Sequence, residues 1–515
     1  MRYLDKPPLL YGLAAAGFGL WGPSEAVARL GPLLGAVAAV AGTALLGARL
    51  LGPAGGLAAG AALLGSALFA AFGRYVRPET LFVAAIQWGF AGLLLSSARS
   101  RALGGAALGL AALAKDPLGL VGPLGAVALA RALGGRLRPV RAWLPPGALA
   151  LAGLIGLGWY ALASLATPGF AWYTVVDNHL LNAARARQFP DEDVPLSGLE
   201  FLAVSLLGAF PWAIGAGGAA LDLVRRRAWR EPGETAWVAL GLWAVGVIAL
   251  FALLPFKLPH YGLPAYPAMA LLAARWWMDP ARGRGAIAAH ALAFAVVAAA
   301  CAAAAASDGR AFTGAVFSAA DVATRKEAAA GAVAPLIAWA DLQPVVARTA
   351  VAFAVGAAGL AVAAARRSPA LGLAAALATM LASVPAVAAG LGQVAAGRAV
   401  RVMAAEVAAR AGPGVLVLHE GPIEQSGALE FYSGRRPVLV DATRSVLGFG
   451  ARFPDAAEAF WDRERLAREW RSGRSLLLVT PRPPGRSAVD ALPRERVRLL
   501  LAHNGRRLFE SVPAP

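Results

Sequence analysis

Cysteine and charge are both scarce in this 515-residue chain. Cys301 is the only cysteine, which excludes a small secreted module held together by disulfide bonds. Charged residues make up 15% of the chain, against about 25% in soluble domains, while hydrophobic residues reach 58%. A disordered chain or a collagen-like fibre does not have this composition. So much apolar surface cannot all be buried in water-soluble folds, and the sequence therefore predicts an integral membrane protein.

Lysine is also rare. Arginine supplies 44 of the 48 positive charges, and the lysines are Lys6, Lys115, Lys257 and Lys326. With 30 acidic residues, the formal net charge is +18. In a soluble protein this excess would suggest a nucleic-acid partner. Here the arginines lie in short loops between apolar runs, where they set the orientation of membrane helices, so we predict no binding to nucleic acid.

Apolar runs long enough to cross a bilayer divide most of the chain. A spanning helix needs about 20 apolar residues. The runs between charges and Pro or Gly breaks predict about twelve spans, at 29–51, 52–73, 79–96, 102–114, 117–133, 142–165, 198–221, 235–255, 261–277, 285–306, 346–365 and 370–393. The short basic loops then all fall on one face, which is the cytoplasmic one. We therefore expect a transmembrane domain over 29–393, preceded by an outer juxtamembrane segment, 1–28.

The chain changes character after about residue 394. Short apolar runs at 415–418, 438–440 and 476–479 alternate with charged, helix-like stretches such as 455–471. This alternation is typical of a small α/β domain. We predict that 394–515 form such a domain outside the cytoplasm, on the same face as the long loops 166–197 and 307–345.

Short polar motifs gather at the outer ends of the predicted spans. They are Asp5-Lys6, Arg74 to Glu79, Lys115-Asp116, Asp177 to His179 and Lys257 to Tyr261. Three of the four lysines are among them, and the compact charge of lysine suits a phosphate. Any one lysine is explained as well by snorkelling at a helix end. Three lysines on one face instead favour an anionic site.

Carboxylates accompany these lysines. Asp5, Glu79 and Asp116 could act as general bases on an acceptor hydroxyl or stabilise a cationic sugar, although Glu79 and Asp116 could equally cap helices. The histidines form no ligand pair at helical spacing, but His260 and Asp5 could together hold a divalent metal ion. There is no Walker motif, no G-x-S-x-G and no glycine-rich nucleotide loop, which favours a lipid-borne donor over a nucleotide.

The order of these motifs resembles the GT-C superfamily of polytopic glycosyltransferases. More narrowly, it resembles the bacterial lipid A aminoarabinose transferase and protein O-mannosyltransferase-like group. The matching stretches are Lys6-Pro7-Pro8-Leu9, Arg77-Pro78-Glu79, Gly109 to Pro117, Pro168 to His179, Phe210-Pro211-Trp212, Lys257 to Pro267 and Ala428 to Arg435. The last stretch resembles a strand and turn of the family's outer domain. The resemblance covers nearly the whole chain, and the ordered set is more specific than any single motif.

The resemblance implies an enzyme of the bacterial inner membrane that takes a sugar from a polyprenyl-phosphate donor. The sugar would pass to lipid A, an envelope glycan or a protein on the periplasmic side, among membrane lipids. The implied site residues are Glu79 and Asp5 for catalysis; Lys6, Arg74, Lys115, Lys257 and Tyr261 for the donor phosphate; and Asp177 and His179 near the acceptor. Asp5 and His260 lie where some relatives bind a metal, and no other cofactor is predicted.

The family's principal catalytic aspartate precedes its K-P-P-L motif. The printed sequence reaches Lys6 almost at once, so we expect this aspartate and a first spanning helix to lie upstream of Met1. Two other functions remain open, a secondary transporter or lipid flippase and a catalytically inactive membrane scaffold. A transporter would be expected to contain internal repeats, which we do not find, and it has no use for a folded outer domain.

Overall fold

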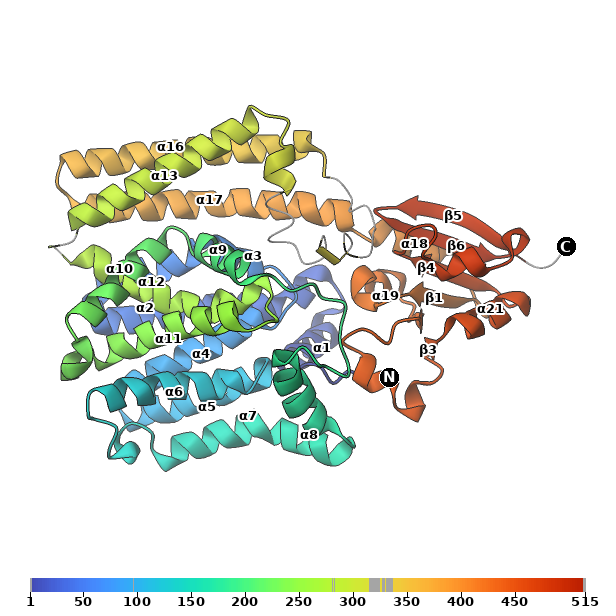
Figure 1. Cartoon of the computed structure of the whole chain (residues 1–515), viewed down its shortest axis with the longest axis horizontal. Coiled ribbons are helices and arrows are strands. Elements are labelled where there is room, and N and C mark those ends of the chain that lie inside the picture. The colour runs from blue at the N-terminus through green and yellow to red at the C-terminus, as the bar shows by residue number, and fades with distance from the viewer. Residues whose placement is uncertain are drawn as a thin grey trace.

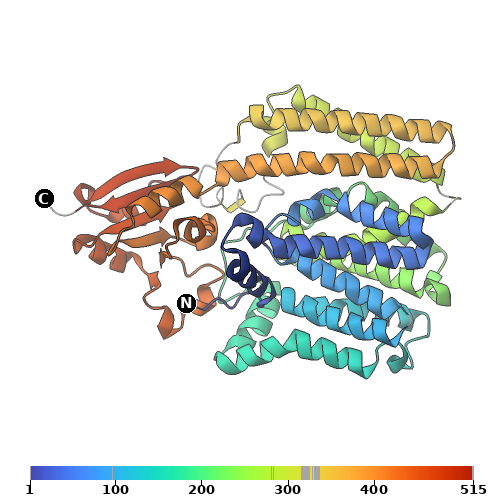
Figure 2. The same ribbon diagram turned by 180° about the vertical axis from the view of Figure 1, so that it is seen from behind.

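The computed structural model describes residues 2–95, 97–279, 281, 283–314, 325–326, 329 and 337–512. It consists of a bundle of long helices with a small sheet-containing domain at one end (Figure 1). The bundle contains α1 (Leu9–Trp21), α2 (Glu25–Leu64), α3 (Ala67–Phe72), α4 (Glu79–Leu94), α5 (Ala98–Ala114), α6 (Leu118–Leu133), α7 (Pro146–Ala166), α8 (Phe170–Trp172), the π-helix η2 (Tyr173–Leu181), α9 (Gly198–Gly208), α10 (Trp212–Arg225), α11 (Thr235–Leu253), the 3₁₀ segment η5 (Pro259–Ala265), α12 (Tyr266–Met278), α13 (Gly283–Ala305), α16 (Trp339–Ala365) and α17 (Pro369–Arg398). Helices α13, α16 and α17 form a layer on one side, and α5, α6 and α7 lie on the opposite side (Figures 1 and 2).

Six of the described helices are long and apolar enough to cross a membrane, or seven if the bent pair α9 and α10 counts as one span. They are Glu25–Leu64, Pro146–Ala166, Pro232–Leu253, Arg284–Ala305, Trp339–Ala365 and Pro369–Arg410. The bent pair turns by 104°. The chain is therefore a multi-pass membrane protein, as predicted, while the number twelve stays a prediction. Arg282 and much of the 307–345 loop lie outside the described residues.

Helix α2 contains two of the predicted spans. The chain turns at Gly52, where φ is 81°, a value that favours glycine. The two arms then run back against each other so closely that a Cβ at Gly56 would lie 2.5 Å from the carbonyl oxygen of Ala44. Small residues allow such an approach between membrane helices. Helices α4 and α5 also pack closely at glycines, because a Cβ at Gly92 would lie 2.4 Å from the Cα of Gly104.

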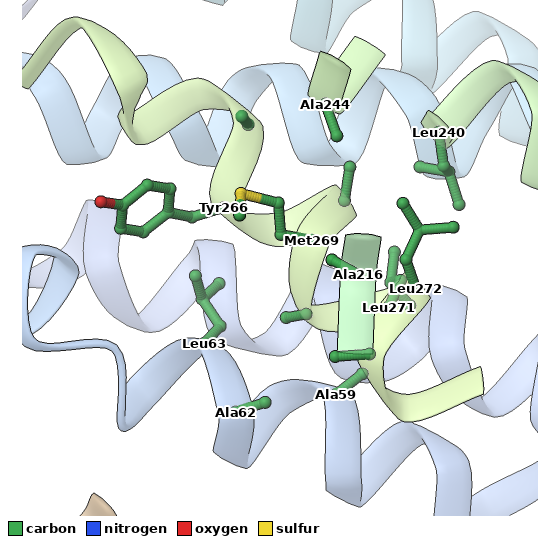
Figure 3. Close-up of a cluster of buried hydrophobic side chains, with 14 of the residues drawn as sticks. Ala59, Ala62, Leu63, Ala216, Leu240, Ala244, Tyr266, Met269, Leu271 and Leu272 are labelled. Carbon is green, nitrogen blue, oxygen red and sulfur yellow. The ribbon is translucent and has the colours of Figure 1, made fainter. Parts of the chain in front are cut away.

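The core of the bundle lies where α2, α10, α11 and α12 meet (Figure 3). Helix α12 is buried along most of its length, whereas the outer helices expose apolar side chains. Its Tyr266 is buried, and the hydroxyl donates a hydrogen bond to the carbonyl oxygen of Ser205 at 2.7 Å. This helix therefore forms a fixed base for η5, the segment before it, which carries His260 and Tyr261.

The C-terminal domain is built on a six-stranded sheet of order β3-β2-β1-β4-β6-β5. Its elements are α18 (Arg401–Arg410), β1 (Leu416–Glu420), η6 (Ile423–Ser426), α19 (Leu429–Ser433), β2 (Val438–Val440), α20 (Gly448–Ala451), β3 (Phe460–Trp461), α21 (Arg463–Arg471), β4 (Leu476–Thr480), β5 (Val497–His503) and β6 (Arg506–Ser511). Strands β1 to β4 are parallel, and β5 and β6 form an antiparallel hairpin. The prediction of a mainly α membrane protein with a small C-terminal α/β domain is confirmed.

One expectation for a smaller segment differs from the structure. The stretch 428–435, expected as a strand and turn, forms the helix α19, which ends at Gly434 with φ 64°. This run is too short for its period to separate helix from strand. The segment 1–28 contains the helix α1, and its place on the outer face stays a prediction.

Candidate functional site

A cavity of about 1130 Å³ opens between the helical bundle and the C-terminal domain and continues between α6 and α11. One end is polar and is lined by Asp5, Lys6, Arg77, Glu79, Lys115, Asp116, His179, Arg187, Asp191, Asp193, His260 and Tyr261. The other end, here called the apolar arm, is lined by Leu118, Gly122, Gly125, Ala126, Leu129, Leu133, Leu223, Val224, Val238, Gly241, Leu242, Val245 and Leu250. Several arm residues, such as Leu129, Val224 and Val245, also lie on the exposed apolar surface of the bundle. The cavity thus suits a molecule with an anionic head and a long apolar tail.

Glu79 lies at the centre of the polar end. It is the first residue of α4 and is buried. Its Oε1 is 3.3 Å from Lys115 Nζ and 3.2 Å from His260 Nε2. Its Oε2 is also buried but has no hydrogen-bond partner among the described residues. An unpaired buried carboxylate oxygen is costly, so a donor such as a hydroxyl group of a ligand would stabilise this atom.

The two lysines of the cavity approach from different segments. Lys6, before α1, forms an ion pair with Asp5, whose Oδ1 accepts a hydrogen bond from Tyr173 at 3.4 Å. Burial lowers the pKa of Lys6, but the neighbouring Asp5 outweighs this, so the pKa is above its usual value and the side chain is charged. Lys115 follows α5, and its ammonium lies 5.0 Å from the centre of the Tyr261 ring. Both cations therefore face the space where an anionic head would bind.

The structure pairs His260 with Glu79, whereas the sequence had suggested a metal site with Asp5. The described residues contain no group of three or more histidine, cysteine or acidic side chains that could hold a metal ion. Glu79 and His260 would supply two ligands, fewer than the three protein ligands of a typical catalytic zinc site. The Arg77 guanidinium also lies 3.3 Å from Nδ1 of His260, which disfavours a bound cation. These protein groups alone do not complete a metal site.

Asp116 and His179 join the α5–α6 turn to the π-helix η2. Nε2 of His179 donates to Oδ2 of Asp116 at 2.9 Å, and Nδ1 donates to the carbonyl oxygen of Thr174 at 2.6 Å. Both ring nitrogens can donate only in the imidazolium form. The hydrogen bond to Asp116 accordingly raises the pKa of His179 above its ordinary value, partly offset by burial and by the positive charge of Lys6. Burial raises the pKa of Asp116, but the bond and charge of His179 outweigh this and lower it.

This pair predicts a pH dependence of stability. His179, whose pKa is raised by folding, contributes to the free energy of unfolding. This contribution is fully present below the ordinary pKa of 6.5 and is lost as pH rises through the pKa of the folded state. The contribution of Asp116 to the free energy of unfolding has the opposite dependence, because its pKa is lowered by folding. It is present above the ordinary pKa of 3.8 and is lost as pH falls through the pKa of the folded state. We therefore expect the pair to stabilise most between about pH 4 and 6.5, by about 1 kcal/mol. The unfolding temperature of the wild type relative to His179→Gln should show this maximum. A difference that is constant from pH 5 to 8 would contradict it.

Three predicted site residues do not line the cavity. Arg74 is exposed and lies outside the cavity lining. The ammonium of Lys257 is buried and donates to the carbonyl oxygens of Ala252 and Leu254, at 3.2 and 2.7 Å, where it caps the end of α11. Asp177 is fully buried and accepts hydrogen bonds from Arg187 and from the backbone of Gln188. The other predicted residues, Asp5, Lys6, Glu79, Lys115, His179, His260 and Tyr261, all line the cavity.

Sequence reasoning did not single out Arg77, Arg187, Asp191 or Asp193 as site residues, yet each lines the polar end. Arg187 also ties its loop together, because its guanidinium contacts Asp177, Asn178 and Asp191. Arg77 lies two residues before Glu79 in the R-P-E motif, which was a usable signal. The loop residues Arg187, Asp191 and Asp193 offered no sequence signal beyond the acidic run itself.

The chain is similar to one protein family and to two solved structures. Residues 5–159 match the family model described as dolichyl-phosphate-mannose-protein mannosyltransferase. This stretch contains Asp5, Lys6, Arg77, Glu79 and Lys115, the core of the polar end. No curated protein sequence matches the chain.

Two solved structures share the fold over the whole chain. They are ArnT from Cupriavidus metallidurans bound to undecaprenyl phosphate, with a TM-score of 0.78, and the same protein in the apo state, with a TM-score of 0.79. Each is 20% identical to this chain, and the match covers 100% of this chain and 90% of ArnT. The architecture around the cavity is therefore that of a known membrane protein fold.

Proposed function

We propose that this chain is a glycosyltransferase of the GT-C superfamily, and that it transfers a sugar from a polyprenyl-phosphate donor to an acceptor that enters beside the C-terminal domain. The observation that carries the proposal is the two-part cavity. Its polar end holds the cations Lys6, Arg77 and Lys115, and its apolar arm continues for the length of α6. A lipid phosphate has a matching shape, and the related ArnT structure was obtained with such a lipid.

The residues of the polar end suit the chemistry of this transfer. The bond between the anomeric carbon and the phosphate oxygen breaks, and its electron pair leaves with the polyprenyl phosphate. The acceptor hydroxyl oxygen forms the new bond to the anomeric carbon, and its proton passes to a carboxylate. Glu79 is our candidate for that base because its Oε2 is buried and without a partner among the described residues, and Asp5 is the second candidate. Lys6 and Lys115 would neutralise the leaving phosphate.

The placement of the domains suggests where the acceptor binds. We assign 29–393 to the transmembrane catalytic domain and 394–515 to an outer domain that faces the periplasm of a bacterial inner membrane. Two residues of the outer domain, Glu424 and Val446, line the polar end of the cavity. An acceptor in the periplasm would meet this rim first. Lipid A, an envelope glycan and a protein hydroxyl are the three candidate acceptors.

The test is a transfer assay with the purified full-length chain in lipid nanodiscs. Polyprenyl phosphate carrying a labelled sugar is supplied with lipid A, with a glycan fraction or with a hydroxyl-bearing peptide. Label that moves to one acceptor supports the proposal and names the acceptor. Movement of intact donor between leaflets without release of sugar would instead indicate a flippase. Donor binding without either event would indicate an inactive scaffold.

Replacing Lys6 by alanine is expected to lower transfer about 100-fold, because one of the fixed charges that stabilise the leaving phosphate is removed. The rate of sugar release is the measurement. Arg310→Ala is the matched control, since its side chain is 90% exposed on the same face and does not line the cavity. Equal rates in the two variants would contradict the role of Lys6.

A further inference from the structure

The loop between η2 and α9, residues 182–197, crosses the mouth of the cavity and is here called the strap. Its acidic run bends at Glu192, and the backbone N–H of Asp193 donates to Oδ1 of Asp191 at 3.0 Å. Asp191 and Asp193 face the cavity. Glu192, between them, points the other way and contacts the C-terminal domain. The first and third of these consecutive acids therefore line the cavity, and the second contacts the C-terminal domain.

Glu192 meets a particular edge of the C-terminal sheet. In a parallel sheet, the crevice beyond the carboxyl ends of the strands binds ligands where the strand order reverses. The order β3-β2-β1-β4 places this reversal between β1 and β4, which end at Glu420 and Thr480. The partners of Glu192 are Gln425, five residues beyond the end of β1, and Arg482, two residues beyond the end of β4. The strap carboxylate thus occupies the position that a ligand takes in other sheets of this kind.

The contacts of Glu192 use both carboxylate oxygens. Oε1 accepts a hydrogen bond from Nη2 of Arg482 at 2.7 Å, and Oε2 accepts one from Nε2 of Gln425 at 2.9 Å. The two charged side chains are 20% and 21% exposed, so water screens the pair only in part.

Contacts within the C-terminal domain position Arg482. Gly421 follows β1 with φ 79°, a value that favours glycine, and its Cβ position lies in ordinary van der Waals contact with the guanidinium of Arg482, at 3.4 Å. The backbone N–H of Arg482 donates to Oγ1 of Thr480, which in turn donates to the buried carboxylate of Glu420. Contacts within the C-terminal domain therefore help to hold Arg482 at the crevice, in addition to its contact with Glu192.

We propose that the crevice at the carboxyl ends of β1 and β4 is a docking site for the Glu192 carboxylate, and that this docking holds the strap as the acceptor-side wall of the cavity. Glu192 is then a positioning residue. It acts through Asp191 and Asp193, which it fixes on the cavity side of the strap. Two further contacts hold the end of the strap that precedes α9. Asp193 forms an ion pair with Lys326 at 2.5 Å, and the N–H of Leu196 donates to the carbonyl oxygen of Lys257 at 3.0 Å. Among the ion pairs of the described residues, the pair of Glu192 with Arg482 is the only one that joins this acidic run to the sheet domain.

Docking can be tested without turnover by limited trypsin digestion of the full chain in nanodiscs. Arg185 is exposed and lies in the strap with Arg187, so cleavage there reports on strap order. Glu192→Arg and Arg482→Glu should each raise the rate of cleavage after Arg185 about tenfold, because a charged hydrogen bond is replaced by repulsion. Fragments are identified by mass, so that the trypsin site that Glu192→Arg adds is counted separately. The double variant E192R/R482E restores opposite charges and should return the rate to within about twofold of the wild type.

Glu430→Arg is the matched control, because it reverses an exposed ion pair with Arg436 in the same domain. It should leave strap cleavage unchanged, and gel filtration with an unfolding curve verifies that each variant is folded. Glu192→Gln provides a milder second variant, which should give an intermediate rate. The docking proposal is overturned if E192R cleaves at the wild-type rate, or if the double reversal restores nothing.

The role as an acceptor-side wall rests on the proposed transfer reaction and has its own measurement. With lipid A as the acceptor probe, Glu192→Gln should raise the KM for lipid A about tenfold, with kcat within about twofold and unchanged binding of undecaprenyl phosphate. A fall in kcat with unchanged KM would overturn the wall role. If the wild type transfers no sugar to any acceptor, the proposed function fails, and the trypsin result still decides the docking.

Discussion

Replacing Glu79 by glutamine is expected to lower sugar transfer about 1,000-fold, the largest effect that we predict for a single side chain. The amide keeps the size of the side chain but cannot take a proton from the acceptor, and general-base catalysis contributes about 10²–10⁴-fold. The charge that pairs with Lys115 is lost as well, at a site where Glu79 is buried and the side chain of Lys115 is only 15% exposed. Initial rates of label transfer from the polyprenyl-phosphate donor measure the effect.

Glu200→Gln is the matched control for this experiment. Glu200 caps α9 and pairs with Arg325, but it does not line the cavity. We expect its variant to transfer sugar within about twofold of the wild type. Binding of undecaprenyl phosphate should survive in Glu79→Gln, since the cations remain. A variant that keeps more than about a tenth of the wild-type rate would rule out Glu79 as the base.

Filling the apolar arm should have the second largest effect. Gly125 lines the arm, and a Cβ there would meet no atom within 4 Å, so a phenylalanine fits the helix but projects into the path of a lipid tail. Gly125→Phe is expected to weaken binding of undecaprenyl phosphate about 100-fold. Displacing about four methylene groups of the tail, at about 0.8 kcal/mol each, is enough for this loss. A competition assay with labelled undecaprenyl phosphate gives the affinity.

The control is the same change at Gly153 on α7, which also has open space within 4 Å and lies outside the cavity lining. Gly153→Phe should bind the lipid as the wild type does. A phosphate carrying a single isoprene unit should bind Gly125→Phe and the wild type alike, because its tail ends before Gly125. An equal loss for long and short tails would show that the arm does not hold the tail.

The sequence predicted the positions of the helices well because apolar length is a local property. Each predicted span falls on helix, but 52–73 covers the second arm of α2 and then α3, and 198–221 covers the bent pair α9 and α10. The strands at 416–420, 438–440 and 476–480 also lie where the apolar runs predicted them. The helix α19 was missed because five residues carry too little periodicity, and it is fixed by its place between β1 and β2.

The candidate site was predicted less evenly, for a physical reason. Motifs at the ends of helices show which residues lie near the polar end, but they do not show where a long side chain points. Lys115 and Lys257 both follow an apolar helix, yet the ammonium of Lys115 reaches Glu79 while that of Lys257 turns back onto the carbonyls of its own helix. Asp177 and His179 are two residues apart in η2, and only His179 faces the cavity.

The sideways exposure of the apolar arm has a kinetic consequence. Leu129, Val224 and Val245 line the arm and are 48%, 61% and 57% exposed on a surface that lipid tails would cover. A donor would therefore arrive by diffusing within the plane of the bilayer, not from bulk water. The concentration that governs its capture is the mole fraction of donor among the lipids. Adding inert phospholipid at constant volume should slow transfer as surely as removing donor, whereas changing the volume of buffer should not.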